Sequence, residues 1–253
     1  MRAGSSATCA NASRAGRATA ARGAYLLQLG QVPYREAWDL QRSLAGAVSQ
    51  GAIPDTVLLL EHPPVVTLGR RTDDAELHVP EGAEVEVVET DRGGKSTFHG
   101  PGQLVCYPIL DLKRHGRDVK QYVRNLEEAL IRTVEPFGLA AEPIEGLTGV
   151  WLTPPPRKLA SIGVHVSRWV TTHGYALNVD LDPAPFTEWI TACGLEEATF
   201  TTIAREAGRE VSVDEVRPHA VAALAEVFGL ELEELPADDA PGLWPQPVHG
   251  QLA

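Results

Sequence analysis

A chain of 253 residues, 43% of them hydrophobic, can bury one sizeable core, and this length favours a single catalytic domain. The net charge of -12 opposes nucleic-acid binding, which needs a basic face. No apolar run approaches the roughly 18 to 20 residues of a membrane span, so we expect a cytoplasmic protein with neither nucleic-acid nor membrane partners.

The two ends of the chain differ in composition from its middle. Residues 1–23 hold four arginines and no acidic residue among small side chains, so they cannot form a core. We interpret them as a disordered N-terminal extension, with a mitochondrial transit peptide as the alternative. The patterned catalytic domain is expected at residues 24–235, followed by a loosely ordered tail rich in Pro, Asp and Gly at residues 236–253.

Periodicity and turn residues predict the elements of the middle region. In chain order we expect a strand at 25–29, a helix at 37–48, strands at 57–60, 65–68 and 85–87, a glycine-rich loop at 92–102, a strand at 104–110, a helix from 118 to 134, strands within 149–179 broken at 154–156 and 173–174, and a capped helix from 212 to 229. The strand at 85–87 should be half-buried, with Val85 and Val87 facing the core. This order predicts an α+β fold, a sheet with helices against one face.

Cys193 is the candidate nucleophile, since a thiolate forms an acyl thioester readily. A free thiol has a pKa near 8.5 and is only a few per cent ionised at neutral pH, so it needs an activator. Lys158 is the candidate, because a buried lysine can act as a base and its ammonium form favours a thiolate. A buried structural cysteine and an edge-strand lysine are the alternatives, and spacing alone leaves them open. Cys106 is interpreted as a core residue.

The glycine-rich loop is the strongest sign of a ligand site. Its glycines allow close backbone approach to a ligand, and Arg92 and His99 can bind an anionic or carbonyl group. A P-loop is excluded because Glu89 stands where that pattern needs glycine. A tight turn between strands is the alternative interpretation.

Several motifs occur together, namely RGG at 92–94, TFHGPGQLV at 97–105, YPI at 107–109, KLASIGV at 158–164, HGYALNV at 173–179 and CG at 193–194. They resemble the octanoyltransferases of lipoate biosynthesis, in the biotin/lipoate protein ligase superfamily, from residue 25 to residue 229. The resemblance implies the mixed sheet and surrounding helices of that superfamily, and a catalytic pair of Cys193 and Lys158. It also implies an acyl-binding pocket formed by Arg92, Gly93, Gly94, Lys95, Ser96, Thr97, Phe98, His99, Ser161, Ile162, Gly163, Gly174, Tyr175 and Ala176.

The same resemblance implies a reaction. An octanoyl group would pass from octanoyl acyl carrier protein, through a Cys193 thioester, to a lysine of the lipoyl domains of 2-oxoacid dehydrogenase subunits and of glycine cleavage H protein. Conversion of a thioester to an amide is downhill, so no ATP, cofactor or metal is expected. His62, beside Pro63, is expected to line the pocket.

Two alternatives remain from the sequence. An ATP-dependent lipoate or biotin ligase of the same fold would not need the cysteine. A noncatalytic acyl-carrier-binding module would keep the pocket but would be marked by loss of Cys193 or Lys158, and both are present. A generic cysteine hydrolase ranks last, because neither histidine-containing motif resembles a protease signature.

Overall fold

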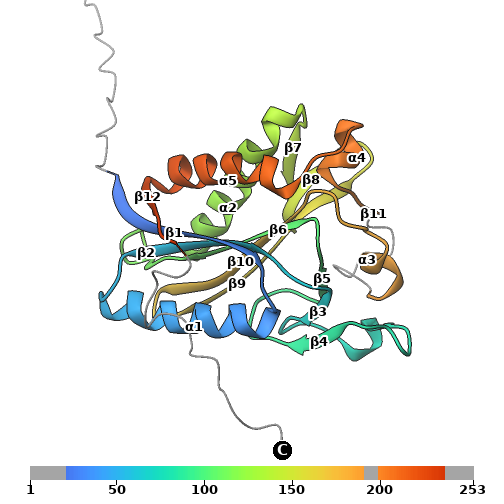
Figure 1. Cartoon of the computed structure of the whole chain (residues 1–253), viewed down its shortest axis with the longest axis horizontal. Coiled ribbons are helices and arrows are strands. Elements are labelled where there is room, and N and C mark those ends of the chain that lie inside the picture. Colours follow the sequence, from blue (N-terminus) through green and yellow to red (C-terminus); the bar gives the residue numbers. More distant parts are fainter. Residues whose placement is uncertain (1–20, 191–198, 237–253) are drawn as a thin grey trace, which may run out of the picture.

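The computed structural model describes residues 21–190 and 199–236, which form two sheets with helices packed around the larger one (Figure 1). The strands are β1 (Arg22–Gln31), β2 (Asp55–Glu61), β3 (Val65–Leu68), β4 (Glu86–Glu89), β5 (Thr97–His99), β6 (Gln103–Ile109), β7 (Ala141–Ile144), β8 (Leu147–Leu152), β9 (Arg157–Ser167), β10 (Val170–Asn178), β11 (Thr199–Phe200) and β12 (Leu230–Glu234). The helices are α1 (Tyr34–Gln50), α2 (Val119–Val134), α3 (Pro185–Glu188), α4 (Ile203–Ala207) and α5 (Val213–Phe228), with 3₁₀ turns η1 (Asp74–Glu76) and η2 (Glu135–Phe137).

The larger sheet is mixed and has the strand order β12-β1-β2-β6-β10-β9-β8-β7, with β11 paired to β9. Strand β1 runs parallel to both of its neighbours, whereas the pairs from β2 through β7 are antiparallel. The smaller sheet has the order β4-β3-β5. The α+β class and mixed sheet predicted from the sequence are confirmed.

Helices cover both faces of the larger sheet, so the expectation of helices against one face is wrong. Along β2, Val57 and Leu59 pack in the cluster that contains α2 and α5, whereas Leu58 and Leu60 pack in the cluster that contains α1. The reason is visible in the sequence, because this strand is apolar at four consecutive positions, residues 57–60. A strand without alternation must be buried on both faces.

Side-chain caps mark the starts of two long helices, α2 and α5, whereas α1 follows Pro33 without such a cap. Asp118 accepts a hydrogen bond from Gln121 N at 3.0 Å and starts α2, and Ser212 accepts one from Glu215 N at 3.2 Å and starts α5. Gly229 ends α5 in the left-handed conformation. These side chains satisfy backbone groups that a helix terminus leaves unpaired.

Two local predictions are wrong. His173 and Gly174 lie inside β10, and the turn falls instead at Arg168 and Trp169, which both have positive φ as a two-residue hairpin requires. In β4 the buried side chain is Val88, whereas Val87 is 37% exposed. Strands β5, β7, β11 and β12 and helix α4 have no counterpart in the expected elements, since β5 lies within the expected glycine-rich loop. Strand β1 starts at Arg22, inside the extension expected at residues 1–23.

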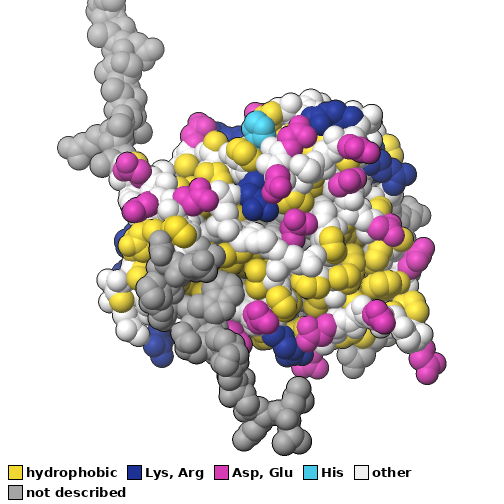
Figure 2. Space-filling view, viewed as in Figure 1, with side chains coloured by type: hydrophobic (Ala, Val, Ile, Leu, Met, Phe, Trp, Pro, Cys, Tyr) yellow, Lys and Arg dark blue, Asp and Glu magenta, His cyan; other side chains and the backbone are white. Residues whose placement is uncertain are grey.

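The surface agrees with the acidic composition. Figure 2 shows acidic side chains spread across the viewed face, with fewer basic ones among them and apolar side chains gathered toward its right-hand side. Within the described ranges, no helix is long and apolar enough to cross a bilayer.

Candidate active site

A cavity of about 230 Å³ lies between the glycine-rich loop and strands β8 to β10. Many of the residues predicted for the site line it: Arg92, Gly94, Lys95, Ser96, Thr97, His99, Lys158, Ser161, Ile162, Gly163, Gly174, Tyr175 and Ala176. The fold thus brings together three motifs that lie far apart in the sequence. The cavity is slightly smaller than the roughly 300 to 1,000 Å³ of pockets for drug-sized ligands, which suits a small ligand.

Two of the predicted site residues that the structure describes are absent from the cavity wall. Gly93 and Phe98 do not line it. The Phe98 ring instead packs edge-on against Phe186 and Trp189. Cys193 lies outside the described residues.

Further residues line the cavity that the site prediction did not include, and they are Tyr34, Arg71, Tyr107, Gly146, Leu147, Thr148, Trp151, His173 and Phe200. Tyr107 and His173 belong to the motifs that carry the resemblance, so the sequence could have identified them as site residues. Tyr34, Trp151 and Phe200 sit in apolar patterns that indicate only a core. Their place at the cavity depends on strand pairing, which sequence spacing does not reveal.

Lys158 is buried, with 4% of the residue exposed, and lines the cavity. It lies in β9 between two strands: Trp151 of β8 is its antiparallel partner and Phe200 of β11 its parallel partner. Its carbonyl oxygen accepts a hydrogen bond from Thr201 N at 3.0 Å. Its Nζ lies 5.0 Å from the centroid of the Trp151 ring. The buried lysine expected from the sequence is therefore present, and a surface edge lysine is excluded.

Arg92 holds the glycine-rich loop in shape. Its Nη2 donates to the carbonyl oxygen of Thr67 at 2.6 Å and its Nη1 donates to that of Lys95 at 2.7 Å. The residue is 6% exposed, so these hydrogen bonds form away from water, where each is electrostatically stronger than in solvent. The guanidinium thereby ties the loop to β3, which fixes one wall of the cavity.

The loop also lies directly on β9. Gly93 N donates to the carbonyl oxygen of Val164 at 2.9 Å. A Cβ atom at Gly163 would lie 3.1 Å from the carbonyl oxygen of Gly93 and 3.2 Å from Arg92 Cδ. Glycine at position 163 therefore permits the close approach of loop and strand that closes the cavity on this side.

His173 is held between two polar side chains at the cavity. Its Nε2 lies 2.7 Å from Asp91 Oδ1, and its Nδ1 lies 3.3 Å from the Tyr34 hydroxyl. Burial lowers the pKa of His173 despite the neighbouring carboxylate, while the hydrogen bond from His173 lowers the pKa of Asp91. A neutral ring that donates to Asp91 and accepts from Tyr34 satisfies all three groups.

His62 does not line the cavity, contrary to the sequence expectation. It lies behind the wall, where its Nδ1 donates to the carbonyl oxygen of Val32 at 2.6 Å and its Nε2 accepts from the Tyr107 hydroxyl at 2.7 Å. Burial lowers the pKa of His62 to about 4. The ring is therefore neutral at pH 7 and supports Tyr107 and the stacked rings of Tyr34 and His99.

Cys106 is fully buried in the core, as expected, and burial raises the pKa of its thiol. It is therefore not a nucleophile. Among the described residues, no group of three or more His, Cys, Asp or Glu side chains is arranged to hold a metal.

Sequence comparison places the chain in a family. Residues 33–225 match the model of the lipoyl protein ligase A/B catalytic domain. An octanoyltransferase of Chloroflexus aurantiacus is 48% identical over 208 residues, which cover 80% of this chain and 93% of the relative. The chain belongs to the octanoyltransferase family. An octanoyltransferase of Mycobacterium tuberculosis is 54% identical over 199 residues, covering 78% of this chain and 84% of the relative. Family membership confirms the resemblance and the enzyme class, an acyltransferase.

Solved structures agree on the fold. A bipartite lipoate protein ligase from Thermoplasma acidophilum superposes with a TM-score of 0.68 at 17% identity, covering 85% of this chain and 87% of that one. A lipoate-protein ligase A bound with ATP gives a TM-score of 0.70 at 17% identity, covering 85% and 89%. At this identity the likeness concerns the fold alone, and it confirms the lipoate-ligase architecture expected from the motifs.

Proposed function

We propose that this octanoyltransferase-family enzyme moves an octanoyl group from octanoyl acyl carrier protein to a lysine of a lipoyl domain in two acyl transfers, through a thioester on Cys193. The acceptors would be the lipoyl domains of 2-oxoacid dehydrogenase subunits and glycine cleavage H protein. The catalytic domain, expected at residues 24–235, includes β1 from Arg22 onward and acts in the cytoplasm. The reaction uses neither ATP nor a metal.

In the first transfer, Lys158 takes the proton of the Cys193 thiol. The thiolate attacks the carbonyl carbon of the donor thioester and forms a new C–S bond. The bond to the carrier sulfur breaks, and the carrier leaves as a thiol with the proton from the Lys158 ammonium.

In the second transfer, the neutral amine of the acceptor lysine attacks the same carbonyl carbon. A C–N bond forms, the C–S bond to Cys193 breaks, and Lys158 accepts the proton of the amine. The products are an amide on the acceptor and a Cys193 thiolate, ready for the next donor.

One observation carries this proposal. Lys158 is buried in the wall of a small cavity and pairs with β11, the strand that follows residues 191–198 in the chain. Ile190, on the other side of that segment, bridges to Leu77. Both ends of the segment that contains Cys193 are thus anchored, and Phe200 of β11 lines the cavity itself. A base, an acyl-sized space and a nucleophile close by in the chain are the parts that acyl transfer needs.

The test is octanoyl transfer to a purified lipoyl domain, followed by the mass of that domain. We expect the domain to gain one octanoyl group from octanoyl acyl carrier protein without ATP. A gain that occurs only with free octanoate and ATP would contradict the proposal and support an ATP-dependent ligase. Binding of the donor without any gain would support a noncatalytic module.

A further inference from the structure

The Lys158 side chain lies against two residues of β8, Gly149 and Trp151, which together we call its cradle. The cradle is defined by contacts to the lysine side chain itself. Because a lysine amine sits on a long, flexible stem, something must fix its place if it is to serve one sulfur atom and then one incoming amine.

The first contact is with the Trp151 ring. Trp151 and Lys158 lie directly opposite each other in the β8–β9 ladder, so their side chains are cross-strand neighbours. Lysine Nζ stands 5.0 Å from the ring centroid, within the range of a cation–π contact. Trp151 is 1% exposed, so the contact is desolvated, which is where such contacts are strongest.

The second contact is with Gly149. A Cβ atom at this position would lie 3.0 Å from Lys158 Cε and 3.5 Å from Nζ. The lysine stem therefore runs directly over the Gly149 backbone. The φ of Gly149 is +121°, a backbone conformation that residues with a side chain rarely adopt. Glycine is required here first by the neighbouring strand, because a Cβ would lie 2.5 Å from the Ala160 carbonyl oxygen, and the same bare backbone leaves room for the end of the lysine.

The third observation is a shift in the ladder at this place. The register between β8 and β9 changes between Val150 and Trp151, so that Val150 faces Ala160 while Trp151 faces Lys158. An irregularity of this kind re-aims the side chains beside it and is common next to active sites. The Trp151–Lys158 pair is therefore the first pair in the new register.

We propose that Trp151 is a positioning residue for Lys158: its ring face holds the lysine amine at the cavity wall for both acyl transfers. The catalytic part of this inference rests on the proposed function. The contact between Trp151 and Lys158 can be measured without substrate. Trp151 acts through Lys158 and needs no contact with the acyl group.

The kinetic test uses Trp151→Leu, which removes the aromatic ring, and Trp151→Phe, which keeps an aromatic ring that forms a weaker cation–π contact. We expect Trp151→Leu to lower kcat about 2- to 30-fold, the range that one cation–π contact represents, with the donor KM changed less than about twofold. Trp151→Phe should recover part of kcat. Trp169→Leu is the matched control, since Trp169 is 39% exposed in the β9–β10 turn, and its kcat should stay within about twofold.

The direct test is competitive labelling of lysines with a small amine reagent, read by peptide mass spectrometry without substrate. We expect labelling of Lys158, relative to exposed Lys120 on α2, to rise about 2- to 30-fold in Trp151→Leu and less in Trp151→Phe. If Trp151→Leu fails to fold, Trp151→Phe carries both tests. Unchanged labelling together with an unchanged kcat per folded molecule would overturn the cradle. Changed labelling in a protein that transfers no octanoyl group would support the cradle and contradict the proposed function.

Discussion

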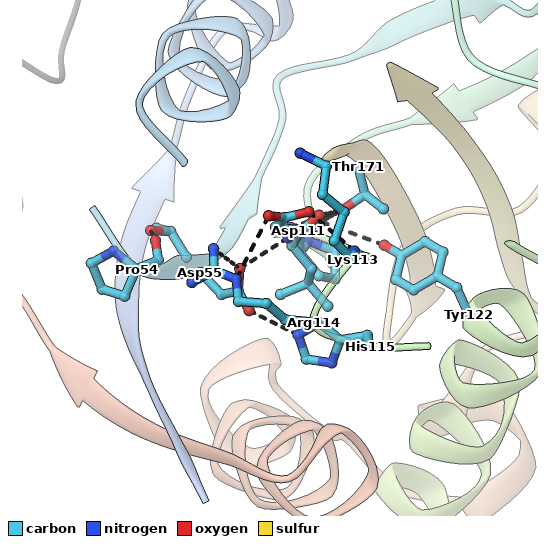
Figure 3. A network of polar contacts seen from close by, with 11 residues as sticks. Pro54, Asp55, Asp111, Lys113, Arg114, His115, Tyr122 and Thr171 are labelled. Carbon is cyan, nitrogen blue, oxygen red and sulfur yellow. Dashed lines mark hydrogen bonds and ion pairs between the residues drawn. The ribbon is translucent and has the colours of Figure 1, made fainter. Parts of the chain in front are cut away.

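Two groups of buried polar side chains, one at an end of the larger sheet and one around the cavity, differ in how many hydrogen-bond partners their polar atoms have. Where β2 begins and β6 ends, the Asp55 carboxylate accepts from Asp111 N at 2.9 Å, Arg114 Nη2 at 3.1 Å and His115 Nε2 at 2.8 Å (Figure 3). Around the cavity, Ser96 Oγ and Trp151 Nε1 are buried without a hydrogen-bond partner among the described residues.

The difference separates a structural cluster from a functional one. A carboxylate that accepts from three donors of its own chain ties a loop to a strand. Unpartnered buried polar atoms cost free energy, and these two belong to residues that line the cavity. Substitutions in the Asp55 cluster should therefore change stability, whereas substitutions at the cavity should change activity.

The largest effect is expected for Lys158→Ala. Loss of the group that moves protons should lower octanoyl transfer about 10²- to 10⁴-fold, the usual contribution of a general acid–base group. The free energy of unfolding should change by less than about 2 kcal/mol. Transfer assays paired with urea unfolding measure both quantities, and full activity in this variant would remove Lys158 from the mechanism.

Asp55→Ala should show the reverse pattern. It leaves buried His115 and the Asp111 N–H without their shared acceptor, so we expect a loss of about 3 kcal/mol in the free energy of unfolding. The kcat per folded molecule should stay within about twofold. Asp39→Ala is the control, because its ion pair with Arg42 is exposed and contributes at most about 1 kcal/mol. Equal stability of the two variants would show that the Asp55 cluster is not structural.

Acid should weaken the fold through His62. Its pKa is about 4 in the folded protein and about 6.5 when unfolded, so between these values the unfolded chain binds the proton first. Stability is present above pH 6.5 and falls toward pH 4, by about 3 kcal/mol in total from this residue. Urea unfolding at several pH values should give a shallower slope for His62→Gln than for the wild type. Parallel slopes would contradict the buried, neutral histidine.

Gly163→Ala should have the smallest effect. The added Cβ would press on the Gly93 carbonyl oxygen and shift the glycine-rich loop, so we expect the donor KM to rise about tenfold while the fold persists. Gly46→Ala in α1 is the control, since a Cβ there meets nothing within 4 Å, and it should stabilise the protein by about 0.5 to 1 kcal/mol. An unchanged KM in Gly163→Ala would show that the loop adapts without cost to binding.

The sequence predicts the parts of this fold that depend on local patterns. Continuous apolar runs marked β2 and β6, and the capping side chains of Asp118 and Ser212 marked the starts of α2 and α5. His173 and Gly174 were mistaken for a turn because glycine usually breaks a strand. Here glycine is needed because a Cβ at position 174 would lie 2.1 Å from the Cys106 carbonyl oxygen on the neighbouring strand.

The site was predictable where motifs carried it and not where strand pairing did. The glycine-rich loop and Lys158 were found because their residue types are unusual for their surroundings. Trp151 was missed because an apolar residue in a strand indicates only a core, and its pairing with Lys158 depends on a register shift that spacing does not encode. Phe98 was included by its place in a motif, although it packs in the core.

The central claim is a covalent octanoyl group on Cys193. The most direct measurement is the intact mass of the protein after incubation with octanoyl acyl carrier protein alone, followed by mapping of the modified peptide. We expect one octanoyl group on Cys193, present also in Cys106→Ala and absent in Cys193→Ser. An adduct on another residue, or octanoyl transfer that persists in Cys193→Ser at the wild-type rate, would contradict the account.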